Sequence, residues 1–197
     1  MKSILIVLLL SLLSSVSLAD LNCPTNIIFE EFVDVKTNAG FTELSLNGVG
    51  LKKIFLFKVF YGALYLQKNS SNGDSIVNSK EIKVFTVHAL RNISKKQLVD
   101  EWTDEFERLC AEDCKKLQPF HDQLMSYARD VNKNERFSLA FLPNRLEFIP
   151  TGGEDFPPIK SVAYGKLMLK AAVGSDAGDD KLKKGLLGQD SKLCKEI

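Results

Sequence analysis

Residues 46–66 form the segment that most constrains how this chain can fold. Gly48 and Gly50 indicate a turn, and residues 54–66 are almost all aliphatic or aromatic, with Lys58 as the one interruption. This run predicts a long β-strand that is apolar on both faces. Such a strand must be covered on both faces, or must border an apolar cavity. The main functional question is therefore whether the chain encloses a filled core or a ligand pocket.

The N-terminus has the pattern of a secretory signal peptide. Lys2 precedes an almost wholly aliphatic run over residues 4–13, and Ser17 to Ala19 form a small-x-small cleavage site. The apolar run is shorter than the ~20 residues that span a bilayer. We expect residues 1–19 to be removed and residues 20–197 to form a single domain, exported to the periplasm or secreted. We predict no transmembrane segment after cleavage.

Composition excludes several classes of function. The 26 basic and 25 acidic residues nearly balance, and no basic stripe with interleaved aromatics indicates a nucleic-acid partner. The sequence has no Gly-rich phosphate loop, no nucleophile elbow and no zinc-protease motif, so we expect no cofactor. Thirteen Phe against one Trp and four Tyr suit a core or the wall of an apolar pocket.

The four cysteines favour two disulfides, because an exported protein folds in an oxidising compartment. Four cysteines allow three pairings. We favour Cys23–Cys194, which joins the two ends of the domain, and Cys110–Cys114, which fastens the end of a helix. A metal site is the alternative, since Cys-x3-Cys is a possible ligand spacing, but His121 is the only further ligand near it.

Hydrophobic periodicity predicts strands first and helices later. We expect a hairpin from residues 27–35 and 42–46, strands at 54–66 and 81–90, and a loop at 69–74. A capping box formed by Ser94 and Gln97 begins a helix whose apolar stripe includes Leu98 and Trp102. A helix at 117–131, a hairpin from 136–142 and 146–149, and helices at 159–173 and 181–187 follow. Segregated elements of this kind predict an α+β fold with an antiparallel sheet.

Two isolated residues, His88 and Arg91, are candidates for a chemical role. His88 lies within a predicted strand and has no partner nearby in the sequence, so a structural role is favoured over a catalytic one. Arg91 ends the same strand, where it is available for an anion or simply for solvent.

Four segments resemble the bacterial, exported branch of the chalcone isomerase-like family. They are residues 46–53 (LNGVGLKK), 57–66 (FKVFYGALYL), 90–94 (LRNIS) and 182–188 (LKKGLLG). The resemblance runs from about residue 44 to residue 188. It implies an open-faced β-sandwich, in which a long antiparallel sheet is covered by a layer of helices with a cleft between them.

The resemblance also implies that the chemistry of the plant enzymes is missing. Aligning the plant motifs places Phe60 at a threonine position, Leu98 at a tyrosine, Glu105 at an asparagine and Gly165 at a hydroxyl. Where the plant enzymes carry the catalytic arginine, this sequence offers only Lys52 or Lys53. Losing a single donor to a developing negative charge typically costs ~10²–10³ in rate. We therefore expect no chalcone isomerase activity and a more apolar cleft.

Three readings of the function remain. The first is an exported, non-catalytic protein that binds a hydrophobic small molecule such as a fatty acid in the cleft. The second is an isomerase with other catalytic residues, Tyr61, Tyr65 or Glu105, and the third is an interaction protein with no ligand. The oligomeric state is left open. The residues that we expect to contact a ligand are Lys52, Lys53, Phe60, Tyr61, Arg91, Leu98, Trp102 and Glu105.

Overall fold

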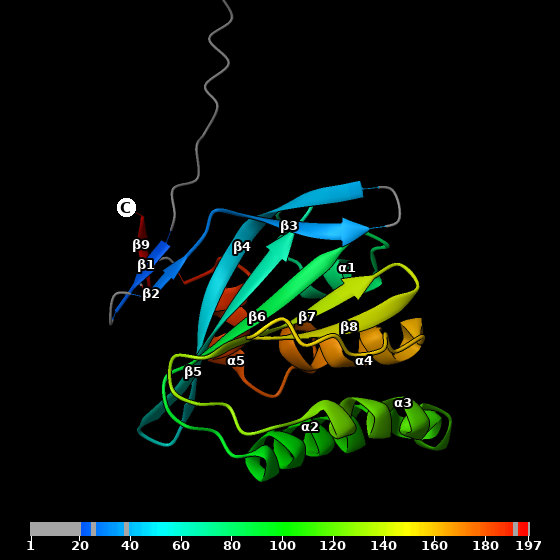
Figure 1. The fold of residues 1–197 in the computed structure, drawn as a ribbon. Helices are drawn as coiled ribbons and strands as arrows, with labels where there is room; N and C mark the ends of the chain where they lie inside the picture. The colour runs from blue at the N-terminus through cyan, green and yellow to red at the C-terminus, as the bar shows by residue number, and fades with distance from the viewer. Residues whose placement is uncertain (1–20, 25–26, 38–39, 191–192, 197) are drawn as a thin grey trace, which may run out of the picture.

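The computed structural model describes residues 21–24, 27–37, 40–190 and 193–196 of the 197-residue chain (Figure 1). The predicted signal peptide lies outside the described residues. The strands are β1 (Leu21–Cys23), β2 (Ile27–Phe29), β3 (Phe32–Thr37), β4 (Gly40–Ile54), β5 (Phe57–Leu66), β6 (Lys83–Ala89), β7 (Arg136–Leu142), β8 (Arg145–Pro150) and β9 (Lys195–Glu196). The helices are α1 (Gly73–Asn78), α2 (Lys95–Cys110), α3 (Cys114–Tyr127), α4 (Val162–Val173) and α5 (Asp180–Leu186), with a short 3₁₀ turn at Ala111–Asp113.

The central feature is a six-stranded antiparallel sheet with the order β3-β4-β5-β6-β7-β8. A second, three-stranded sheet has the order β2-β1-β9. Every strand of the larger sheet pairs with its neighbour in sequence, so the topology is a simple meander interrupted by helices. This arrangement confirms the predicted α+β class with an antiparallel sheet.

The opening of the chain differs from the predicted hairpin. Residues 27–35 were expected to form one strand, but β2 ends at Phe29 and β3 begins at Phe32 in the other sheet. The polar pair Glu30 and Glu31 separates them. The second arm is β4, which extends far beyond the expected 42–46.

The turn before β5 lies elsewhere than predicted. Gly48 and Gly50 sit inside β4, and the strand continues to Ile54. The chain reverses at Phe55 and Leu56, since Ile54 pairs with Phe57 across the hairpin. The prediction of one strand over residues 54–66 was therefore wrong at its start. Two apolar residues occupy a two-residue turn, where Asn-Gly or Gly-x is usual.

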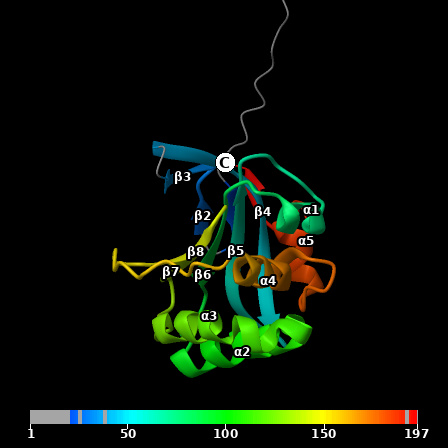
Figure 2. The same cartoon turned by 90° about the vertical axis from the view of Figure 1, so that its right-hand side faces the viewer.

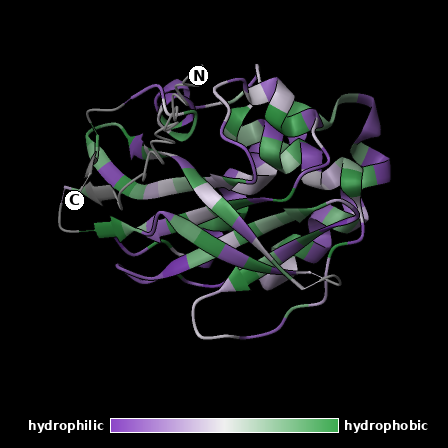
Figure 3. Ribbon diagram, turned by 90° about the horizontal axis from the view of Figure 1, so that it is seen from above, coloured by the Kyte–Doolittle hydropathy of each residue, from purple (hydrophilic) through white to green (hydrophobic). Residues whose placement is uncertain are grey.

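Both faces of β5 are covered, as its apolar sequence demands. Leu64 and Leu66 belong to a core beneath the helices, whereas Tyr61, Ala63 and Tyr65 belong to a second core. The second core includes residues of the small sheet, which lies on the opposite side from the helices (Figure 2). Hydrophobic and hydrophilic bands alternate along strands and helices (Figure 3). The two-faced burial of the central strand thus defines two layers of core.

Close glycine contacts place α5 against β4. A Cβ on Gly48 would overlap the carbonyl of Gly185, and one on Gly50 would overlap the carbonyl of Leu182. The Asn47 amide also donates to the Leu186 carbonyl at 2.8 Å. The glycines predicted to make a turn therefore serve a close approach between backbones. Segments 46–53 and 182–188, two of the four that resemble the chalcone isomerase-like family, therefore pack on each other.

The helix layer agrees largely with prediction. Ser94 caps α2, and both hydrogen bonds of its capping box with Gln97 are present. Helix α3 begins at Cys114, earlier than predicted, and includes Pro119. The expected loop at 69–74 is cut short by α1, which starts at Gly73. In the described part of the chain, no helix is long and apolar enough to cross a membrane.

Both predicted disulfides are present. Cys23 is bonded to Cys194, and Cys110 to Cys114. The first joins β1 to the segment just before β9, so the two ends of the domain are tied together. The second fastens the end of α2 to the start of α3. The alternative of a metal site on Cys110 and Cys114 is thereby excluded.

Candidate functional site

A cavity of about 310 Å³ lies between the six-stranded sheet and the helices. The sheet supplies its floor, and α2, α4 and the start of α5 supply the opposite walls. The apolar lining consists of Ile54, Val59, Phe60, Phe85, Val87, Ile93, Leu98, Trp102, Phe137, Leu139, Met168, Ala171, Ala172 and Leu182. The polar lining consists of Lys52, Arg91, Asn92, Gln97, Asp100, Glu101, Asp104, Glu105 and Asp179. The cavity is therefore an apolar chamber with a polar mouth.

A β-bulge shapes the floor. The partner of Lys52 is Phe60, but the partner of Lys53 is Lys58, so Val59 is an extra residue on β5. Bulges commonly re-aim side chains next to functional sites. Here the bulge allows the consecutive residues Val59 and Phe60 both to line the cavity.

Aromatic rings form one end of the chamber. The Trp102 indole on α2 meets Phe137 edge-on at 5.9 Å between ring centres and Phe148 at 6.3 Å. The apolar stripe predicted for α2 is thus the helix's contribution to both core and cavity. Since Trp102 is the only tryptophan of the chain, its fluorescence reports directly on this site.

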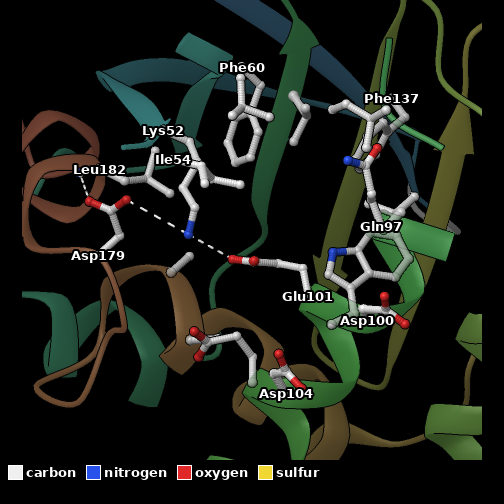
Figure 4. A pocket seen from close by; sticks show the side chains of 18 of the residues that line it. Lys52, Ile54, Phe60, Gln97, Asp100, Glu101, Asp104, Phe137, Asp179 and Leu182 are labelled. Atoms are coloured by element: carbon white, nitrogen blue, oxygen red, sulfur yellow. Dashed lines mark hydrogen bonds and ion pairs between the residues drawn. The ribbon is translucent and has the colours of Figure 1, made fainter. Parts of the chain in front are cut away.

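Charged groups from three elements meet at the mouth (Figure 4). The Lys52 ammonium on β4 lies 2.7 Å from the Glu101 carboxylate on α2 and 3.8 Å from the Asp179 carboxylate. Asp179 also accepts hydrogen bonds from the first backbone amides of α5. The Lys52 side chain is only 16% exposed. This bridge joins the sheet to two helices and already neutralises the lysine.

The remaining charges at the mouth are less tied together. Asp100 pairs with Lys96 at 2.6 Å, and Glu105 pairs with Arg108 one turn along α2. Arg91 is exposed and lies over the ring of Phe57, 5.7 Å from its centre. It forms no ion pair with any described residue. Arg91 is therefore the cation at the mouth that is available to an incoming anion.

The structure gathers most of the predicted ligand-contacting residues in one place. Lys52, Phe60, Arg91, Leu98, Trp102 and Glu105 all line the cavity. Lys53 does not; it is exposed on the hairpin beyond it. Tyr61 does not either, because alternation along β5 turns it into the opposite core. Its hydroxyl lies 3.4 Å from the Pro24 carbonyl, and burial raises its pKa.

The alternative catalytic set is not assembled. Tyr61 and Tyr65 share the core on the far side of the sheet, whereas Glu105 lines the cavity. Of the positions aligned with plant catalytic residues, Phe60, Leu98 and Glu105 do share the cavity. Gly165 is not part of its lining and faces Leu146 and Phe141 instead.

Sequence reasoning missed most of the wall opposite the floor. Met168, Ala171 and Ala172 come from α4, and Asp179 precedes α5. Nothing in the local pattern of α4 distinguishes a cavity wall from a core face. Asp179 carried a usable signal, since an aspartate directly before a helical run is a typical N-cap.

The histidines lie away from the cavity. His121 is buried between the helices, with Nε2 3.1 Å from the Thr103 hydroxyl and Nδ1 3.1 Å from the Tyr164 hydroxyl. Burial lowers the pKa of His121. His88 Nδ1 accepts a hydrogen bond from Arg136 at 3.0 Å. No group of three or more potential metal ligands occurs among the residues that the structure describes.

Comparison with known proteins agrees with this architecture. The profile described as chalcone isomerase-like matches residues 28–188. A crystal structure of a fatty-acid binding protein from Arabidopsis thaliana superposes with a TM-score of 0.64 at 14% identity, covering 85% of this chain and 95% of that one. No curated protein sequence matches the chain. At this identity the plant structure shows the fold alone, while the match over residues 28–188 shows that the chain belongs to the chalcone isomerase-like family.

Proposed function

We propose that this protein binds a long-chain monocarboxylic acid, such as a fatty acid, in the cavity between sheet and helices. The observation that carries the proposal is the apolar chamber of about 310 Å³ with a polar mouth. Sites for small ligands are usually clefts of ~300–1,000 Å³ with mostly apolar walls and few polar anchors. The fatty-acid binding protein that shares the fold supports this ligand class.

The walls suit an unbranched hydrocarbon chain. Phe60, Phe85 and Phe137 from the sheet face Met168 and Ala172 on α4. These side chains offer no hydrogen bonds, so the cavity stabilises a ligand by removing apolar surface from water, at roughly 25 cal/mol per Å². Small residues on α4 leave the space that the aromatic floor does not fill.

The carboxylate is expected to meet Arg91 rather than Lys52. Glu101 and Asp179 already surround the Lys52 ammonium, so an anion would have to compete with two carboxylates there. The Arg91 guanidinium is exposed at the mouth and can form a bidentate pair with a carboxylate. Lys52 thereby serves to hold the mouth together, and Arg91 to receive the head group.

Two other readings find less support. The isomerase reading rests on Tyr61, Tyr65 or Glu105, but both tyrosines face the other core and Glu105 is paired with Arg108. The ligand-free reading needs a filled cleft, yet the Phe side chains leave a chamber open.

We also propose that the mature protein acts outside the cytoplasm. The predicted signal peptide at residues 1–19 and the two disulfides support export, because structural disulfides persist in oxidising compartments. An exported carrier would keep an insoluble acid in solution between membranes or cells.

Fluorescence of Trp102 provides the test. Brominated stearate quenches an indole only at close range, so binding in the cavity should quench Trp102 in a saturable way. Ala172→Phe fills the chamber and should weaken the apparent affinity about tenfold or more. Ala163→Phe adds the same ring to the exposed face of α4 and is the matched control. Quenching that is equal in both variants would show that the acid binds elsewhere.

The head group is tested separately. Arg91→Gln should weaken binding of stearate about tenfold, the order expected for a charge-assisted pair, and should leave binding of its uncharged methyl ester unchanged. Lys53→Gln removes a nearby cation that does not line the cavity and serves as the control. If Arg91→Gln affects acid and ester alike, the guanidinium does not recognise the carboxylate.

A further inference from the structure

We propose that the tip of the β4–β5 hairpin docks on a lipid bilayer that carries anionic headgroups. The apolar tip consists of Ile54, Phe55, Leu56 and Phe57. These residues are 47%, 93%, 93% and 64% exposed. Four consecutive large apolar residues in solvent form a patch that a soluble protein ordinarily buries or uses for an interaction.

The backbone of the tip is unfavourable for the residue that occupies it. Phe55 has a φ of 53°, in the region that side chains with a Cβ seldom adopt. A two-residue hairpin turn of this kind normally carries glycine at its first central position. Phe55 and Leu56 thus occupy a strained, fully exposed turn that Gly-Ser would form more easily. Binding of these side chains to a partner explains their presence at the turn.

The charges around the tip identify the partner as anionic. Lys53 and Lys58 are directly opposite each other across the hairpin, a like-charge pair that destabilises a sheet. Arg91 stacks over Phe57 beside them. None of the three cations forms an ion pair with a described residue. An apolar tip inside a collar of basic side chains matches the acyl region and the anionic headgroups of a bilayer.

The size and shape of the patch favour a bilayer over a folded partner. The tip exposes a few hundred Å² of apolar surface. A standard protein–protein interface buries roughly 800 Å² on each side. A narrow hairpin end can insert among lipids, whereas it offers little area to a second protein.

The tip adjoins the mouth of the cavity. Ile54 belongs to both, and Val59 and Phe60 continue from the hairpin into the lining. Arg91, which follows β6 and lies over the Phe57 ring, lines the cavity as well. Docking through the tip would bring the mouth to the lipid surface, where an acyl ligand could enter or leave. Exchange of ligand at the membrane rests on the proposed function, but docking itself does not.

Vesicle flotation tests the docking. The protein should float with vesicles of mixed phosphatidylcholine and phosphatidylglycerol, less with phosphatidylcholine alone, and less at high salt. Phe55→Gly/Leu56→Ser should lower the affinity for mixed vesicles at least tenfold. Because Gly-Ser suits the turn, the same variant should keep or raise the melting temperature. Phe41→Ser is the matched control, since Phe41 is 74% exposed at the opposite end of β4.

The charge collar is tested with Lys53→Ser/Lys58→Ser. This variant should bind mixed vesicles about tenfold more weakly and pure phosphatidylcholine unchanged. Lys36→Ser, beside Phe41, controls for a general change of charge. Failure of the wild type to float, or equal flotation of the tip variant, overturns the proposal. A dimer by light scattering that the tip variant dissociates would overturn it as well, in favour of a second copy of the chain.

Docking and cavity binding are separable. Phe55→Gly/Leu56→Ser should still show quenching of Trp102 by brominated stearate in solution, because neither residue lines the cavity. Ala172→Phe should require about tenfold or more brominated stearate for the same quenching and should still float. A wild-type protein that floats with vesicles but shows no quenching would reject the acyl-binding function alone. A wild-type protein that shows quenching but does not float would reject docking alone.

Discussion

The ammonium of Lys52 on β4 lies 2.7 Å from the carboxylate of Glu101 on α2, across the mouth of the cavity. With Asp179 at 3.8 Å, it links the sheet to α2 and to the N-cap of α5. The two adjacent lysines at 52 and 53 therefore have different roles. Lys52 forms ion pairs across the mouth of the cavity, and Lys53 is exposed on the hairpin.

Lys52→Met should lower the free energy of unfolding by about 1–3 kcal/mol. The pair lies between the exposed case, worth ~0–1 kcal/mol, and the fully buried one, where removal of a partner costs ~3–5 kcal/mol. Lys53→Met, the control, should change stability by less than ~0.5 kcal/mol. Urea unfolding of both variants measures the difference, and equal effects would mean that the bridge has no structural role.

Gly50→Ala should be strongly destabilising, by roughly 3 kcal/mol, the upper end of the usual range for overpacked core positions. Its Cβ would overlap the carbonyl of Leu182, and backbone cannot move aside as a flexible side chain can. Gly165→Ala is the control within a helix, since its Cβ would meet only ordinary contacts at 3.8 and 3.9 Å. That change should stabilise α4 by up to ~1 kcal/mol. Thermal melts of both variants decide whether the glycines in β4 serve the approach of α5.

Stability should fall as the pH drops below about 6.5, the ordinary pKa of histidine. Burial lowers the pKa of His121 and of His88 in the folded state. Below pH 6.5 the unfolded chain therefore binds protons that the folded chain does not, which favours unfolding by up to ~1.4 kcal/mol per pH unit and proton. Above pH 6.5 this contribution is flat.

Denaturant unfolding between pH 7.5 and pH 5 measures this slope. His88→Gln/His121→Gln removes both histidines of the chain and should flatten it. A wild-type stability that stays constant over this range would be inconsistent with two buried neutral histidines.

The two disulfides should differ in their contribution. Cys23–Cys194 spans 171 residues, and Cys110–Cys114 spans 4. Loop-closure entropy assigns about 5 kcal/mol to the first and about 2 kcal/mol to the second. Cys23→Ser/Cys194→Ser should therefore lower the melting temperature more than Cys110→Ser/Cys114→Ser. The opposite order would show that helix fastening, not closure of the chain, dominates.

Local rules predicted the parts of the fold that local chemistry decides. Ser94 and Gln97 formed the expected capping box, because its two hydrogen bonds join residues three apart. The antiparallel class followed from the order of elements. The hairpin turn could not be placed, since Gly48 and Gly50 look like turn residues while Phe55 and Leu56 do not. The role of the two glycines depends on α5, which lies more than a hundred residues away in the sequence.

The site was predictable on one side only. Phe60, Leu98 and Trp102 lie in segments whose pattern or resemblance pointed to the cleft. The prediction that Tyr61 contacts a ligand was wrong. A bulge at Val59 and the alternation of side chains beyond it decide which face of the sheet each side chain takes. Ala172 could not have been found, since only the packing of α4 over the sheet brings it to the cavity.

Native mass spectrometry of the protein purified without detergent tests the central claim most directly, because it requires no choice of ligand. We predict a bound species whose mass corresponds to a long-chain monocarboxylic acid, present on the wild type and on Ala163→Phe but absent from Ala172→Phe. Wild-type protein that carries no such species, and whose Trp102 fluorescence brominated stearate leaves unquenched, would contradict the claim that the cavity is an acyl-binding site.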